Sequence, residues 1–98
     1  MNSNKANHFY KAWEKFVELT NSAHADYMVA SDIVSLVKKP SFNDPTTDNK
    51  TIAVQYQIYN RLNQRLRFYK SRYQTLQNAR DNAFKVWLQL KKESKTNE

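Results

Sequence analysis

The stretch NKTIAVQYQIYNRLNQRLRFYKSRYQTLQNAR, residues Asn49 to Arg80, decides the fold because its apolar side chains recur every three or four positions. That spacing places them on one side of an α-helix, and the row continues in the same alternation beyond the stretch, as in a coiled-coil seam. Its members are Ile52, Gln55, Tyr59, Leu62, Leu66, Tyr69, Tyr73, Leu76, Arg80, Ala83, Trp87 and Leu90. We therefore predict a helix over residues 47–92, followed by a frayed polar tail over residues 93–98.

A second apolar row lies before a cluster of helix-breaking residues that runs from Pro40 to Pro45. The row consists of Phe9, Trp13, Phe16, Thr20, Ala23, Tyr27, Ala30, Val34 and Val37. It predicts a first helix over residues 7–39 and a turn over residues 40–46. Asp44 before Pro45 is typical of an N-cap and first-turn proline, and Asp48 offers a slightly later start for the second helix.

The composition favours an all-α fold in a single domain over residues 1–98. The chain contains no glycine, which removes the residue that type II turns and the primed turns of β-hairpins favour. Two long helices would form an antiparallel hairpin, and the apolar residues outside its seam favour a dimer that builds a four-helix bundle. The alternative is a monomeric three-helix bundle with a break near Thr20 to Ser22, since these residues compete for backbone hydrogen bonds.

The whole net charge of +7 lies in the stretch from Asn49 to Arg80, which holds seven basic residues and no acidic one. At 100° per residue, one side of the predicted helix carries Lys50, Arg61, Arg65, Phe68 and Arg72. Arg67 and Lys70 project from the opposite flank. Arginine suits phosphates and carboxylates because its planar head donates two parallel hydrogen bonds. We call the five residues on the first side the basic stripe and predict that it binds a partner.

Three interpretations of the basic stripe remain open. It could bind an acidic protein, or it could bind nucleic acid through phosphates. It could also be neutralised within the chain by the acidic residues of the first helix, which are Glu14, Glu18, Asp26 and Asp32. We favour a non-enzymatic interaction module that self-associates through its heptad faces and binds an acidic protein, because Tyr59, Tyr69 and Tyr73 lie in the seam and cannot stack on bases.

Several polar and aromatic seam residues have specific expected roles. Trp13 and Trp87 should come together near the open end of the hairpin, either as an aromatic core or as a binding hot spot. Gln55 and Arg80 are the polar members of the second row and could fix register or oligomeric state.

No pattern for catalysis, a cofactor or a metal is found in the sequence. The absence of cysteine excludes disulfides and thiolate metal sites, and His8 and His24 lie too far apart for a helical metal pair. Phosphate-binding loops and nucleophile elbows require glycine. No apolar run is long enough for a membrane span or a signal peptide, so we expect a cytoplasmic protein. Because the catalytic patterns are missing, we also expect that it is not an enzyme.

Lys39-Pro40-Ser41 and Asp44-Pro45 at the turn, with Asn78-Ala79, Asn82 and Lys85-Val86-Trp87 near the C-terminus, resemble the needle subunits of type III secretion systems. The resemblance implies a small helical hairpin that polymerises into a hollow helical filament. The chain departs from that family's pattern in its longer second helix and in the charged tail that follows Leu90.

Overall fold

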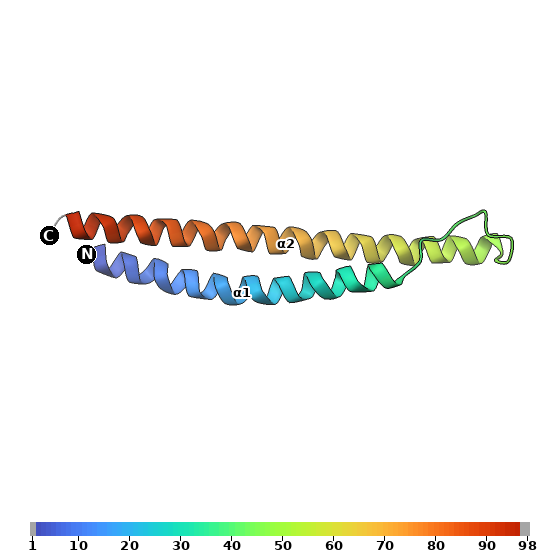
Figure 1. Cartoon of the computed structure of the whole chain (residues 1–98), viewed down its shortest axis with the longest axis horizontal. Helices are drawn as coiled ribbons and strands as arrows, with labels where there is room; N and C mark the ends of the chain where they lie inside the picture. Colours follow the sequence, from blue (N-terminus) through green and yellow to red (C-terminus); the bar gives the residue numbers. More distant parts are fainter. Residues whose placement is uncertain (1, 97–98) are drawn as a thin grey trace.

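The computed structural model describes residues 2–96 and shows two long helices that run antiparallel, with the beginning of the first helix beside the end of the second (Figure 1). Helix α1 spans Asn2–Leu36, helix α2 spans Asn49–Thr96, and residues 37–48 connect them. The molecule measures 77 × 16 × 15 Å, with a radius of gyration of 22.1 Å. A compact chain of this length would have a radius of about 13 Å. The prediction of an all-α helical hairpin is therefore confirmed.

The two apolar rows pack against each other along the hairpin and form its only layer of core. The buried apolar residues in the described part of the chain are Ala6, Ala23, Ala30, Ile52 and Ala83. Small side chains at these positions let the helix backbones approach closely. The larger predicted seam residues remain half-buried; these are Trp13, Tyr59, Leu62, Leu66, Tyr69, Tyr73, Leu76, Trp87 and Leu90. A two-helix pair cannot enclose such residues, because each has neighbours on one side only.

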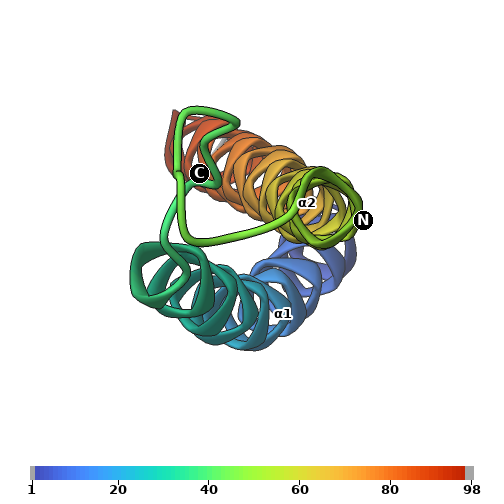
Figure 2. The same cartoon turned by 90° about the vertical axis from the view of Figure 1, so that its right-hand side faces the viewer.

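Ring contacts between the helices fix their register. Tyr10 contacts Trp87 and His24 contacts Tyr73, with ring centroids 5.6 and 5.0 Å apart, so later residues of α1 meet earlier residues of α2. This register places Leu36, the last residue of α1, level with Arg61. The first turns of α2 therefore extend past the end of α1, and the connector folds back along them (Figures 1 and 2).

Helix α1 begins and ends earlier than the sequence predicts. It starts at Asn2 rather than residue 7, and its first turns are supported by Ala6, which continues the seam and is buried. It ends at Leu36 rather than Lys39, since Pro40 disfavours helical geometry in the residue before it. A hydrogen bond from the amide of Val37 to the carbonyl oxygen of Val34, 3.2 Å long, closes the last turn.

Helix α1 is continuous through Thr20, Asn21 and Ser22, so the break considered there does not occur. Thr20 lies in the seam with only 1% of its surface exposed, and burial between the helices holds it in helical geometry. Its Oγ1 atom has no hydrogen-bond partner among residues 2–96. The alternative of three helices is therefore not the observed fold.

The connector is held by two aspartates with different roles. The position of Asp44 before Pro45 predicted that it caps α2, but it does not. Its carboxylate instead accepts hydrogen bonds from the amide and hydroxyl of Thr46 and from the hydroxyl of Thr47. Asp48 is the N-cap, because its Oδ1 accepts a 2.7 Å hydrogen bond from the amide of Thr51. Helix α2 accordingly begins at Asn49 rather than residue 47.

At its other end α2 continues to Thr96, past the expected end at residue 92. No glycine or proline interrupts this part of the chain, and the side-chain amide of Gln89 donates to Glu93 one turn later, at 3.4 Å. Residues 93–96 of the expected frayed tail are thus helical, while residues 97–98 lie outside the described residues.

Acid should weaken the start of α2. The hydrogen bonds from Thr46 lower the pKa of Asp44, and those from Thr51 lower the pKa of Asp48, below their ordinary value of 3.8. A carboxyl whose pKa is lowered by folding stabilises the fold above its ordinary pKa and loses that contribution as the pH falls through the lowered value. We expect thermal unfolding, followed by circular dichroism, to show lower stability at pH 2 than at pH 5. Replacing both aspartates by asparagine should reduce this difference in stability. If the double variant lost as much stability between pH 5 and pH 2 as the wild type, the prediction would be wrong.

Candidate partner-binding face

The basic stripe is open to solvent along its whole length. Lys50, Arg61, Arg65, Phe68 and Arg72 are all exposed, and Phe68 exposes 62% of its surface. In the described part of the chain, no ion pair joins these residues to the acidic residues of α1. The ion pair present there joins Arg80 to its neighbour Asp81, with Nε and Oδ1 3.1 Å apart. The interpretation that the first helix neutralises the stripe therefore has no geometric support.

Contacts between the helices show on which side of the hairpin the basic stripe lies. Tyr10 and Phe84 each follow a seam residue directly in the sequence, and they contact Trp87 and Trp13 across the hairpin. The residues that come directly after a seam residue in the sequence therefore lie on the same side of the molecule in both helices. Residues that precede the seam by one position, such as Arg65 and Arg72, lie on the other side.

The side that carries Arg65 and Arg72 also carries most of the exposed large apolar residues. On α2 these are Val54, Ile58, Phe68 and Val86, and on α1 they are Leu19, Val29, Ile33 and Leu36. All eight precede a seam position by one or by five residues, which places them on the flank of the arginines. We call the surface formed by these eight residues with Arg61, Arg65 and Arg72 the open face.

The charge of the open face is strongly positive. Helical periodicity adds Lys5 and Lys15 to its edge on α1, and Asp26 is the acidic residue that falls on the same flank. The other acidic residues of α1, namely Glu14, Glu18 and Asp32, project from its far side. The open face therefore combines apolar side chains with an excess of cations, whereas the acidic groups of α1 lie mostly elsewhere.

The opposite side of the hairpin holds an aromatic cluster near the two ends of the chain. Tyr10 and Phe84 each contact both Trp13 and Trp87, with ring centroids 5.6–5.8 Å apart. The ammonium group of Lys91 lies 5.3 Å from the Trp87 ring, which is within cation–π range. A hydrogen bond to Glu14 raises the pKa of Tyr10. The two tryptophans thus come together as predicted, through Tyr10 and Phe84.

A shallow groove of about 520 Å³ lies beside this cluster, lined by Trp13, Val17, Arg80, Asp81, Phe84 and Lys85. Arg80 was expected within the seam, but its side chain is 30% exposed and turns toward Asp81. Its long stem allows the charged head to reach solvent while the methylene groups stay at the seam.

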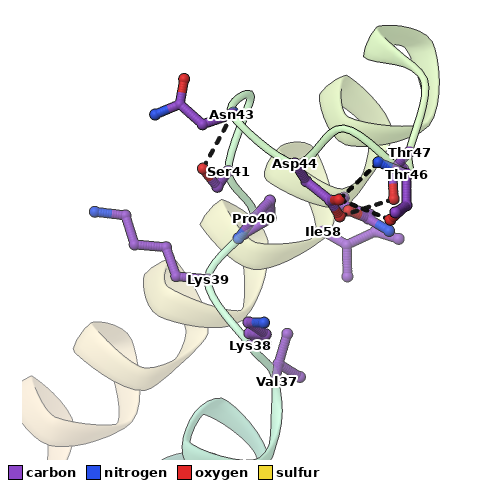
Figure 3. Close-up of a pocket in the computed structure, with 11 residues that line it drawn as sticks. Val37, Lys38, Lys39, Pro40, Ser41, Asn43, Asp44, Thr46, Thr47 and Ile58 are labelled. Atoms are coloured by element: carbon purple, nitrogen blue, oxygen red, sulfur yellow. Dashed lines mark hydrogen bonds between the residues drawn. The ribbon is translucent and has the colours of Figure 1, made fainter.

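A larger pocket of about 740 Å³ lies between the connector and the first turns of α2 (Figure 3). Its lining includes Lys38, Lys39, Thr47, Gln55 and Ile58. Gln55 was predicted to lie in the seam, but it is exposed here because α1 ends before reaching it. Ile58 belongs to both this pocket and the open face, so the two surfaces are continuous.

The seam tyrosines Tyr59, Tyr69 and Tyr73 are half-buried, and the ring of Tyr73 is engaged between the helices. The hydroxyl of Tyr73 accepts a 2.8 Å hydrogen bond from the side-chain amide of Gln77, and its ring contacts His24 and Tyr27. The carbonyl oxygen of Tyr59 accepts from the side chain of Asn63, at 2.9 Å. Stacking on the bases of a nucleic acid is therefore left to Phe68 alone among the aromatic residues of the open face.

Within residues 2–96 no cluster of three or more histidine or acidic residues could hold a metal ion. Neither helix has, in that range, an apolar stretch of the length needed to cross a bilayer. Comparisons with protein families, curated proteins and solved structures found no match for this chain.

Sequence reasoning placed Arg61, Arg65, Phe68 and Arg72 together on α2 but did not place the apolar residues of either helix around them. Val54, Ile58 and Phe68 stand out as apolar residues outside the main row. On α1, the residues Val29, Ile33 and Leu36 form a weaker pattern, because polar residues occupy most of the other positions of their flank. The usable signal was their own spacing of four and three, parallel to the seam row.

Proposed function

We propose that this protein is a non-enzymatic helical interaction module, which binds an acidic protein through Lys50, Arg61, Arg65, Phe68 and Arg72. The observation that carries the proposal is the composition of the open face. Its arginines are exposed and have no ion pair among the described residues, and they alternate with exposed Ile58 and Phe68. Protein interfaces combine apolar contact with arginine in this way.

Nucleic acid is the second candidate partner and is favoured by the same arginines. Phosphate binding alone, however, does not use the valine, isoleucine and leucine side chains that surround them. A protein surface with apolar groups and carboxylates would bury those side chains and also pair with the cations. The acidic protein therefore accounts for more of the open face than a polyphosphate does.

Titrations with labelled polyglutamate and labelled duplex DNA, each at two salt concentrations, would separate the two partners. A stripe that bound duplex DNA through its four cations would give a log–log salt slope of about −3 to −4. Arg65→Ala would then reduce that slope by about one, and Arg67→Ala would not. Arg67 is the matched control because it is also an exposed arginine of α2 and lies on the opposite flank.

Under our proposal, Arg65→Ala and Arg67→Ala lower DNA binding equally, because such binding is only non-specific attraction to a basic protein. Polyglutamate binding should instead fall more with Arg65→Ala than with Arg67→Ala. A selective effect of Arg65→Ala on DNA alone would favour the nucleic-acid function and contradict ours.

A dimeric four-helix bundle competes with a partner for the same apolar rows. The chain exposes 7794 Å², whereas a compact protein of 11.7 kDa exposes about 5,900 Å². A second copy could cover part of this excess. Within one hairpin, however, the two heptad seams already pack against each other, so self-association would have to use an outer side, and the open face carries most of the exposed large apolar residues. There it would bring like-charged arginines together, which is unfavourable.

A further inference from the structure

We infer that the partner presents an acidic amphipathic helix, which lies lengthwise on the open face and contacts both α1 and α2. This inference rests on the proposed function and adds the secondary structure and charge pattern of the partner. It follows from the spacing of the exposed apolar residues, from the distribution of charge, and from the thinness of the core.

The spacing of the open face matches a helix. On α2, the residues Val54, Ile58, Arg61, Arg65, Phe68 and Arg72 follow one another in steps of four and three. On α1, the residues Val29, Ile33 and Leu36 follow the same steps. Rows with this repeat accept the side chains of a third helix as knobs into holes. The α2 row extends over about 27 Å from Val54 to Arg72, and the α1 row lies beside its part from Arg61 to Phe68.

The charge of the open face selects an acidic helix over a second copy of this chain. Arg61, Arg65 and Arg72 lie beside the apolar rows of α2, and the acidic residues expected on that flank are Asp26 of α1 and Glu93, one heptad after Val86. Flanking charges of opposite sign determine which helices pair. A second copy brings the same cations to the interface, whereas a helix with glutamates beside its apolar row would complement them.

The core of the hairpin leaves room for such a helix. Apart from Ile52, the buried apolar residues in the described part of the chain are alanines, and the larger seam side chains are only half-buried. A third helix would cover Ile33, which is 38% exposed, and Phe68, which is 62% exposed. The excess of about 1,900 Å² in accessible surface is larger than the area of about 800 Å² that each partner buries in a standard interface.

The test uses two synthetic peptides of about 21 residues with the same composition, titrated against the full-length chain. The first carries leucine at heptad positions a and d and glutamate at e and g. The second has these residues shuffled, so that its charge is unchanged but no apolar row remains. Fluorescence anisotropy gives the affinity, circular dichroism reports the helix formed on binding, and light scattering gives the mass of the complex.

We expect the patterned peptide to bind at least about tenfold more tightly than the shuffled one, to gain helix, and to form a one-to-one complex. Phe68→Ala and Arg65→Ala should each weaken this binding by about fivefold or more. The matched controls Leu88→Ala and Arg67→Ala, both on the other flank, should leave it unchanged.

Other outcomes separate the two claims. Equal binding of both peptides, lost with Arg65→Ala, would support the acidic partner and overturn the helical one. Binding of neither peptide would overturn both claims. A stable dimer that the patterned peptide cannot displace would assign the open face to a second copy and overturn the inference, as would binding that is insensitive to Phe68→Ala.

Discussion

Ile52→Ala is expected to lower the free energy of unfolding by about 2–5 kcal/mol, the range observed when a large aliphatic side chain is removed from a core. Only 1% of Ile52 is exposed, which makes it the most buried large side chain of the described residues. Proteins of this size are stable by about 5–15 kcal/mol, so the loss should be a large fraction of the total. Urea unfolding followed by circular dichroism measures it.

The stability of this variant tests whether the connector buries Ile52, because α1 does not reach that residue. The connector folds back over the first turns of α2, where Phe42 stacks on Tyr56 with ring centroids 5.2 Å apart. Val54→Ala is the control, since Val54 lies two residues further and is 54% exposed. We expect that variant to change stability by less than about 0.5 kcal/mol. If the two variants cost the same, the connector does not bury Ile52 in solution.

Trp87→Ala is expected to cost about 2–3 kcal/mol, somewhat below the range for a tryptophan buried in a core, because Trp87 is half-buried. Its ring contacts Tyr10 and Phe84, and Lys91 lies over it. Loss of the ring should release the beginning of α1 from the end of α2. Urea unfolding gives the cost, and hydrogen exchange of the first α1 turns reports the local release.

Trp87→Phe is the informative control for that prediction. A phenylalanine keeps an aromatic ring in the cluster, so it should recover much of the lost stability. If Trp87→Ala leaves both stability and exchange unchanged, the aromatic cluster does not hold the two ends together. Trp87 would then be available as a binding residue, the alternative that its sequence position allowed.

The sequence was sufficient to predict the two helices, their antiparallel arrangement and their contact surface. Steps of three and four along both apolar rows are a long-range regularity, and the cluster from Pro40 to Pro45 interrupts it once. The helix ends were harder to predict. Asp48 caps α2 by accepting from the backbone amide of Thr51, whereas Asp44 accepts from the hydroxyls of Thr46 and Thr47, and this difference depends on the path of the connector.

The candidate site was predicted only in part. The basic stripe follows from helical periodicity within α2 alone, so Arg61, Arg65 and Arg72 were identified correctly as neighbours on one side. Their apolar surroundings on α1 depend on the register between the helices, which the ring contacts of Tyr10 and His24 define. Gln55 was misplaced for a related reason, because its environment depends on where α1 ends.

The most direct test of the account is the stability of the variant in which Arg61, Arg65 and Arg72 are all replaced by alanine. The central claim is that these arginines serve a partner and not the fold. They are exposed and form no ion pair within the described residues, so urea unfolding should give the wild-type free energy to within about 0.5 kcal/mol. A loss above about 2 kcal/mol would show that the basic stripe holds the hairpin together, and would contradict the account.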